Sequence, residues 1–169
     1  MGTNWQDLPR VKKGNIGESL VNKYLVAHGY IPYSPDVGGS HPFDRIVVAK
    51  NKKRIFIAES KTKPARKYYP DTGIELKHYE EYCFIEHKHN LDVFLFFVDE
   101  DAGKIYGNWL KKLSASVDVI HNGRMLTYPI TVNGIIFFPL VSMIQIADIP
   151  SSETEAIKGL SSRKDCYRP

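Results

Sequence analysis

The spacing of apolar residues predicts two helices in the first half of the chain. Apolar side chains recur every three or four positions in Lys13–His28 and again in Ile74–His89, the period of an amphipathic helix. Gly29 directly follows the first of these segments, and a glycine at this position commonly ends a helix in the left-handed conformation. We therefore expect a helix over each segment.

Shorter apolar segments predict strands. Phe43–Ala49 and Arg54–Lys61 are rich in isoleucine and valine and are separated by a polar turn, so we expect them to form a hairpin. Leu91–Val98 is almost entirely apolar, as is typical of a central strand that is covered on both faces. Ile105–Leu113 begins with the pattern of a short strand and ends with that of a short helix.

The last third of the chain predicts a second hairpin and a tail. Arg124–Ile130 and Gly134–Leu140 are apolar segments on either side of an Asn133-Gly134 turn. Residues 151–169 are poor in apolar side chains, so we expect a flexible C-terminal tail. Because helices and strands alternate before it, residues 1–150 are expected to form a single α/β domain with a mixed central β-sheet flanked by helices.

Composition narrows the class of protein without identifying it. The chain has 169 residues, of which 43% are apolar and 25% are charged, as in an ordinary globular domain. Its two cysteines are too few for a disulfide framework or a four-thiolate zinc site. The longest apolar run is shorter than a membrane span, and the first residues lack the apolar core of a signal peptide. We expect a soluble cytoplasmic protein without membrane contact.

The distribution of charge predicts contact with a polyanion. The net charge is +4, but residues 50–77 hold nine Lys or Arg against three Asp or Glu, whereas the rest of the chain holds 14 against 16. Residues 62–72, within this basic segment, also carry prolines and tyrosines and are expected to form an exposed loop. A basic segment of this kind suits nucleic acid, although a solvated loop would have the same composition.

Three charged residues are expected to converge on the first hairpin. Asp44 lies at the start of its first strand, and Glu59 and Lys61 lie near the end of its second strand. Side chains two residues apart point to the same face of a strand, so Glu59 and Lys61 project together and the pairing of the strands brings Asp44 close. Charges among apolar strand residues are costly unless they are paired or bind a metal. Glu18 lies beside the apolar stripe of the first helix. A simple ion pair at a strand end remains the alternative interpretation.

Taken together, these residues resemble the motifs of the PD-(D/E)xK, or restriction-endonuclease-like, nucleases. The matching elements are Glu18 on a helix, Asp44 in HPFD and Glu59-Ser60-Lys61 in IAESK, and the resemblance covers roughly residues 13–100. The sequence departs from the family pattern because Pro42 precedes the aspartate by two positions instead of one. The resemblance implies a restriction-endonuclease-like core and a metal-dependent nuclease, with a DNA endonuclease favoured over an enzyme that acts on RNA.

The resemblance also implies a metal site. Asp44 and Glu59 would bind Mg²⁺, with the main-chain carbonyl of Ile57 or Ser60 as a further ligand, and Mn²⁺ would substitute. The cation would polarise the phosphodiester and lower the pKa of the attacking water. Lys61 would orient that water or neutralise the charge that develops on phosphorus, and Glu18 would hold Lys61 or a water of the metal.

The basic loop would then bind the nucleic acid. Its cations would contact phosphates, and its tyrosines would stack on a base or a sugar. The residues expected at this surface are Lys63, Arg66, Lys67, Tyr68, Tyr69, His41 and His78. A role in stabilising the loop is equally compatible with His41, and for His78 a role outside the site is favoured. Cleavage of both strands of a duplex would require a homodimer.

Three alternatives stay open at this point. The same fold could serve as a non-catalytic nucleic-acid-binding module that keeps the basic loop. The apolar hairpin at Tyr128–Phe138 could instead serve as a dimer surface. Cys83 and His87 lie four residues apart on a predicted helix and could bind zinc, although a cysteine among apolar residues is more often buried.

Overall fold

A mixed six-stranded sheet forms the centre of the computed structural model, which describes residues 5–34 and 43–160. In their order across the sheet, the strands are β1 (Ile31–Tyr33), β2 (Arg45–Val48), β3 (Ile55–Thr62), β5 (Val93–Asp99), β6 (Lys104–Trp109) and β11 (Ile144–Asp148). Strands β3 and β5 run parallel, and every other neighbouring pair is antiparallel. The predicted fold class, a mixed central sheet flanked by helices, is confirmed.

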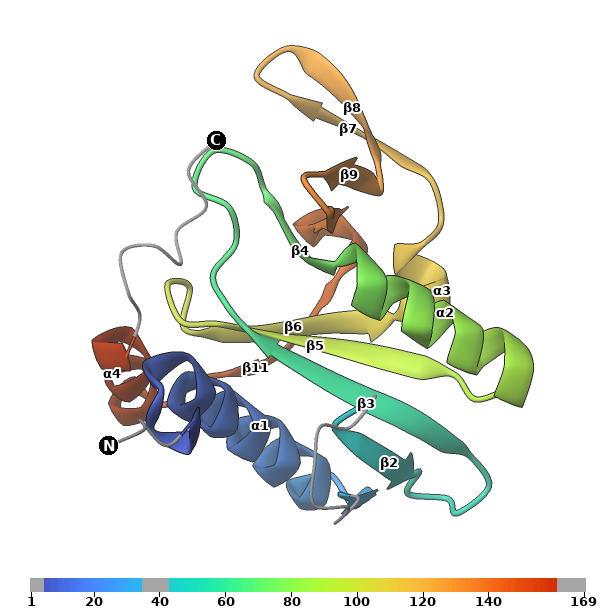
Figure 1. The fold of residues 1–169 in the computed structure, drawn as a ribbon, viewed down its shortest axis with the longest axis vertical. Helices are drawn as coiled ribbons and strands as arrows, with labels where there is room; N and C mark the ends of the chain where they lie inside the picture. The colour runs from blue at the N-terminus through green and yellow to red at the C-terminus, as the bar shows by residue number, and fades with distance from the viewer. Residues whose placement is uncertain (1–4, 35–42, 161–169) are drawn as a thin grey trace.

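Helices cover both faces of this sheet. Figure 1 shows α1 (Pro9–Ala27) and α4 (Ser151–Leu160) together on one side, and α2 (Leu76–His89) and α3 (Leu110–Leu113) on the other. The second side also carries a three-stranded sheet of β4 (Asp71–Glu75), β10 (Ile135–Pro139) and β9 (Ile130–Val132). The remaining elements are the short helices η1 (Trp5–Asp7) and η2 (Leu140–Ser142) and a hairpin of β7 (Val117–His121) and β8 (Arg124–Tyr128).

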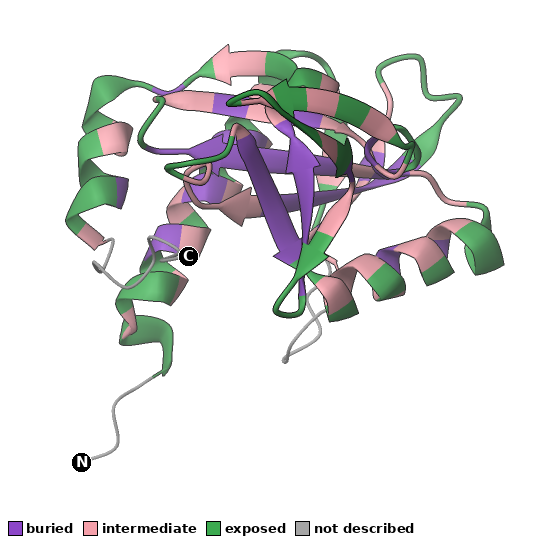
Figure 2. Ribbon diagram, turned by 90° about the horizontal axis from the view of Figure 1, so that it is seen from above, coloured by how far each residue is buried: buried purple, intermediate pink, exposed green. Residues whose placement is uncertain are grey.

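The two faces of the sheet form two separate cores because strand side chains alternate between faces. On β3, Ala58 packs into the core beneath α1, and Ile57 packs into the core beneath α2. Figure 2 shows the buried residues concentrated in the central strands, with exposed residues along the surrounding helices. As predicted from its sequence, β5 is a central strand and almost all of its residues are buried.

The two predicted helices exist but begin at Pro9 and Leu76 instead of Lys13 and Ile74, and three further segments differ from the sequence-based expectations. Residues Ser151–Leu160, expected to belong to a flexible tail, form helix α4, and its single apolar stripe buries Ile157. The expected loop after β3 ends in strand β4, which pairs with β10. Four of the five residues in Asp71–Glu75 are buried, so its sequence lacks the alternation of apolar and polar residues that marks a half-exposed strand.

The third difference is the partner of Arg124–Tyr128. The turn at Asn133-Gly134 exists, but it joins β9 to β10, whereas β8 pairs with β7 across a second turn at Asn122-Gly123. Asn122 and Gly123 have φ of 49° and 73°, and Asn133 and Gly134 have φ of 50° and 74°. Positive φ at both central residues is the type I′ turn that Asn-Gly favours, so the same sequence signal marks both hairpins.

None of the helices in the described part of the chain is long and apolar enough to cross a membrane.

Candidate active site

The pairing of β2 with β3 brings the two predicted carboxylates together. Arg45 lies opposite Ala58, which places Asp44 beside Glu59. The backbone N–H of Asp44 donates to Oε2 of Glu59 at 3.0 Å, and Ser60 donates to Oδ2 of Asp44 from its backbone N–H at 2.8 Å and from its hydroxyl at 2.6 Å. Both carboxylates are therefore oriented by hydrogen bonds from the neighbouring strand, and their predicted convergence is confirmed.

Lys61 joins this pair, as the alternation along the strand predicted. Its Nζ lies 2.8 Å from Oε1 of Glu59, and the exposed fractions of the two side chains are 22% and 5%. The ammonium group therefore remains accessible from solvent while its carboxylate partner is buried. A ligand that approaches this ion pair would therefore meet the lysine before Glu59.

Helix α1 supplies Glu18, which is held near the site by a contact that the sequence analysis did not foresee. Its Oε2 lies 3.6 Å from a terminal nitrogen of Arg45, a buried residue on β2. The preceding residue, Gly17, is packed so closely on β3 that a Cβ there would lie 1.8 Å from Oγ1 of Thr62. Only glycine allows the helix to approach the strand this closely.

Burial and neighbouring charges shift the pKa values of three groups in the cluster. Burial, followed by the charge of Asp44, raises the pKa of Glu18 to about 7. The same two causes, burial first, raise the pKa of Glu59 even though Lys61 opposes them. Burial lowers the pKa of Lys61, but the carboxylates of Glu59 and Asp44 outweigh that effect and the net shift is upward. After burial, the charge of Asp44 contributes to each of these upward shifts, as expected where carboxylates gather.

A positively charged region continues from this cluster along the chain. Burial is the main cause that lowers the pKa of Lys63 to about 8, and the charge of Lys61 adds to the effect. Burial alone would raise the pKa of Glu75 at the end of β4, but a backbone hydrogen bond together with Lys63 and Lys61 lowers it. The site therefore has an acidic end at Asp44 and a basic end at Lys63.

The donor set at the acidic end fits a hard divalent cation. Mg²⁺ is usually bound by one or two carboxylates and keeps several waters, and Asp44 and Glu59 provide two adjacent carboxylates that repel each other. Across the described residues, no three His, Cys, Asp or Glu side chains are arranged to hold a metal ion. Two adjacent carboxylates are the donor set of a magnesium ion that keeps most of its waters.

The basic loop, residues 63–70, is held by a buried ion pair. The guanidinium of Arg66 donates two hydrogen bonds of 2.5 Å to the two carboxylate oxygens of Asp71, which is completely buried. The Tyr128 hydroxyl donates to the same carboxylate at 2.6 Å, and the guanidinium also stacks on the ring of Phe137 at 3.9 Å. Arg66, predicted to bind phosphate, is thus already engaged within the protein.

The other residues expected to bind nucleic acid have different surroundings. Tyr68 is 58% exposed, and the ammonium of Lys67 lies 5.5 Å from the centre of its ring. Tyr69 is packed between Arg66 and the ring of His121. His78, in the first turn of α2, lies 3.2 Å from Glu75, and His41 lies outside the described residues. Lys67 and Tyr68 are thus the members of the loop most open to a ligand.

Sequence reasoning did not identify several residues that shape this site. Tyr82 on α2 is buried and hydrogen-bonded to Glu59, and Glu75 and Arg45 flank the cluster. Helical periodicity marks Tyr82 only as a core residue, so nothing in the sequence distinguishes it. The Gly-x-x-Gly spacing of α1, which ends at Gly17, was the one available signal for close packing.

Comparison with known proteins places the fold. No protein-family model matches the sequence, and no curated protein matches it either. A solved structure, that of the Holliday junction resolvase Hjc from the archaeal hyperthermophile Archaeoglobus fulgidus, superimposes with a TM-score of 0.52. The match covers 79% of this chain and 97% of that protein, with 10% sequence identity. Because Hjc has the restriction-endonuclease-like fold, the chain has the fold that its motifs predicted.

Proposed function

We propose that this protein is a metal-dependent DNA endonuclease that cleaves branched DNA. The observation that carries the proposal is the convergence of Asp44, Glu59 and Lys61 where β2 pairs with β3, and burial together with the charge of Asp44 raises the pKa of Glu59 there. The likeness of the fold to a Holliday junction resolvase supports DNA over RNA and a branched over a linear substrate.

Asp44 and Glu59 would hold the metal ion, with the main-chain carbonyl of Ser60 as a third protein ligand. When bound, Mg²⁺ or Mn²⁺ would offset charge on the scissile phosphate and make a water molecule more acidic. The hydrogen bonds from Ser60 to Asp44 and from the Asp44 backbone to Glu59 fix both carboxylates before the metal arrives. Such preorganisation lowers the cost of ordering the site.

Lys61 would contact the scissile phosphate, and Glu18 would support the site from behind. The ammonium of Lys61 is fixed by Glu59 and partly exposed, so it can donate to a phosphate oxygen as negative charge develops there. Glu18 lies behind the cluster, paired with Arg45, and would hold Lys61 or a water of the metal. Its raised pKa means that metal binding, by adding positive charge, would favour its ionised form.

The basic loop would bind the DNA backbone beside this site. Lys63 and Lys67 would contact phosphates, and Tyr68, the more exposed tyrosine, would stack on a base or sugar. Tyr69 and Arg66 would support the loop from within, because both are packed against neighbouring side chains. His78 and His41 remain candidates at the edge of this surface. A homodimer would supply the second active site needed to cut both strands.

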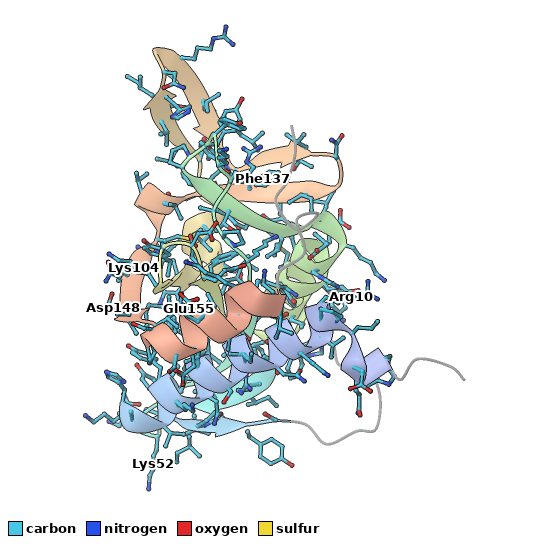
Figure 3. The ribbon with its side chains drawn as sticks, turned by 90° about the vertical axis from the view of Figure 1, so that its left-hand side faces the viewer. Arg10, Lys52, Lys104, Phe137, Asp148 and Glu155 are labelled. Carbon is cyan, nitrogen blue, oxygen red and sulfur yellow. The ribbon has the colours of Figure 1, made fainter. Side chains whose placement is uncertain are left out.

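Cleavage assays with matched variants test this function. Supercoiled plasmid, linear duplex and a four-way junction would be incubated with Mg²⁺, Mn²⁺ or EDTA, using wild type, Glu59→Ala and Lys61→Ala. The control variants are Glu155→Ala and Lys52→Ala, which remove the same charges from exposed positions labelled in Figure 3. We expect metal-dependent cleavage, strongest on the junction, that both site variants lose and both controls keep.

Two outcomes would contradict the proposal in different ways. Wild type and site variants that are equally inert but retard DNA on a gel would indicate the non-catalytic binding module. Cleavage that persists in EDTA, or in both site variants, would assign the activity to other residues.

A further inference from the structure

The β7–β8 hairpin, residues 117–128, forms an arm that stands apart from both larger sheets. Within the described residues, its two strands form a sheet of their own, from Val117 opposite Tyr128 to His121 opposite Arg124. Figures 1 and 3 show the arm projecting from the body of the protein beyond β4 and β9. Isolated two-stranded hairpins are marginally stable in water, so a persistent arm needs anchoring at its base.

The base of the arm is anchored by apolar packing and by the buried ion pair. The inner face of the arm packs against Ile135 and Phe137 of β10. Its inner-face residues are Val117, Val119, Leu126 and Tyr128. The Tyr128 hydroxyl also donates to Asp71, the partner of Arg66 in the basic loop. One buried carboxylate therefore connects the arm with the basic loop.

The tip of the arm also touches the basic loop. Nε2 of His121 lies 2.7 Å from the carbonyl oxygen of Tyr68, and the ring of His121 packs 5.5 Å from that of Tyr69. The loop is the basic member of this pair. Residues 63–70 contain three Lys or Arg and no acidic residue, whereas the arm, residues 117–128, holds one basic and one acidic residue, Arg124 and Asp118. The tip of the arm therefore lies beside a basic surface that the loop provides.

The outer face of the arm is apolar at its tip. Ile120 lies directly opposite Met125, and these side chains are 79% and 69% exposed. They are separated from the turn at Asn122-Gly123 by one residue pair, His121 and Arg124. Isoleucine and methionine offer no hydrogen-bond donor to a phosphate or to a base edge. Next to a basic surface, apolar side chains of this kind gain most from DNA by contact with the faces of unstacked bases.

We propose that the arm binds DNA at interruptions of base stacking, with Ile120 and Met125 packed against bases exposed at a branch point. A two-stranded ribbon fits into a DNA groove, and apolar side chains that enter a base step must separate stacked bases. That separation costs least where stacking is already broken, so the arm selects DNA structure and not sequence. This inference rests on the proposed function, because it names the feature of the substrate that the same enzyme recognises.

The test compares binding to two DNAs without cleavage. Fluorescein-labelled linear duplex and a four-way junction of the same arm sequences would be titrated with full-length protein in EDTA, at one fixed salt concentration. In wild type we expect tighter binding to the junction, and enhanced fluorescence from 2-aminopurine placed at the branch point. The double variant Ile120→Ala/Met125→Ala should reduce the junction preference about tenfold and lose the fluorescence change, with duplex affinity within about twofold of wild type.

The control variant is Val26→Ala, which shortens an exposed apolar side chain near the end of α1, away from the arm (Figure 1). It should bind both DNAs like wild type. An unchanged junction preference in the double variant would overturn the inference, and cleavage assays with Mg²⁺ on the same preparations show separately whether the nuclease proposal holds. Sedimentation of a dimer that the double variant converts to monomer would also overturn it, because Ile120 and Met125 would then contact a second copy.

Discussion

Two buried clusters of charge in this protein have opposite electrostatic designs. At the candidate site, Glu59 shares one cation, Lys61, with Asp44, and burial and mutual repulsion raise the pKa of Glu59. Beneath the basic loop, the buried carboxylate of Asp71 receives two hydrogen bonds from Arg66 and a third from Tyr128. Glu59 also has three partners, Lys61, Tyr82 and the backbone N–H of Asp44, so the clusters differ in the second carboxylate, Asp44, that the first one places beside the same lysine.

The difference separates the cluster that we propose as catalytic from a structural one. A single buried carboxylate balanced by one guanidinium holds segments together and has little capacity left for a ligand. A cluster that retains surplus charge costs stability and is retained where it binds something. Burial and charge alone do not distinguish the two cases, since Asp71 and Glu59 are both buried acids beside a cation.

The largest expected effect is the loss of cleavage in Asp44→Asn. Asparagine preserves the hydrogen bonds from Ser60 but removes a metal ligand, so the cleavage rate should fall about a thousandfold or more. Because the substitution also relieves repulsion with Glu59, the midpoint of thermal unfolding should be unchanged or higher. Cleavage kinetics and thermal unfolding of the same preparation test both statements. A large loss of stability in Asp44→Asn would show that Asp44 is structural, like Asp71.

The structural cluster should show the reverse behaviour. Asp71→Ala leaves the guanidinium of Arg66 without its partner, and breaking a buried pair costs about 3–5 kcal/mol, or about 6–20 °C in midpoint for a chain of this size. The double variant Arg66→Met/Asp71→Leu removes both charges and should recover part of that loss. Calorimetry measures these differences. Equal destabilisation in the single and double variants would show that packing, not charge pairing, is the main contribution.

Addition of a divalent metal should distinguish the clusters without DNA. A ligand that binds only the folded state at a hundredfold excess over its Kd stabilises by about 2.7 kcal/mol. We expect Mg²⁺ or Mn²⁺ to raise the unfolding midpoint of wild type and of Arg66→Met, but not of Asp44→Asn. A metal-dependent shift that persists in Asp44→Asn would place the metal elsewhere.

Gly17→Ala should disturb the acidic cluster through packing. The added methyl group would overlap Thr62, and overpacking of this kind costs about 1–3 kcal/mol. Because α1 carries Glu18, the helix shift should also slow cleavage. Thr62→Ala in the same chain should relieve the overlap, so a double-mutant cycle for unfolding should give a favourable coupling energy. Additive costs would contradict a direct clash.

The smallest effect concerns pH and Glu18. Its pKa is raised from 4.5 to about 7, so in this range the folded state binds a proton that the unfolded state has released. Stability of the metal-free protein should therefore fall as pH rises from about 4.5 to 7. The side chain is 40% exposed, and solvent screening should keep the effect below about 1 kcal/mol. Glu18→Gln in EDTA should flatten this part of the profile, and an unchanged slope would assign it to another group.

The parts of the molecule that were predicted from sequence depend on local periodicity. Alternation along one strand was sufficient to place Glu59 and Lys61 on a common face, and the following apolar strand was recognisably central. The long helices needed only the spacing of their apolar residues. The same reasoning could not pair Arg66 with Asp71, because a charged residue in a basic loop has the same local pattern whether it is solvated or buried.

Tertiary burial accounts for the remaining misses. Helix α4 has too few apolar residues to be predicted as packed, yet the burial of Ile157 is sufficient when α1 provides the opposing surface. Tyr82 belongs to the core by its pattern, and only its hydrogen bond to Glu59 brings it into the site. The pairing of β7 with β8 is marked in the sequence by Asn122-Gly123, the same turn dipeptide that joins β9 to β10 at Asn133-Gly134.

The shared anchor at Asp71 has a consequence for the thermodynamics of recognition. Loop, β4 and arm meet at one carboxylate, so the surface offered to a ligand is already ordered in the free protein. Little conformational entropy would then be lost by the protein on association, and most of the adjustment would fall on the partner. A stiff partner would resist this adjustment, whereas a flexible partner would deform to fit the ordered surface. The protein could therefore discriminate between partners by their mechanical flexibility.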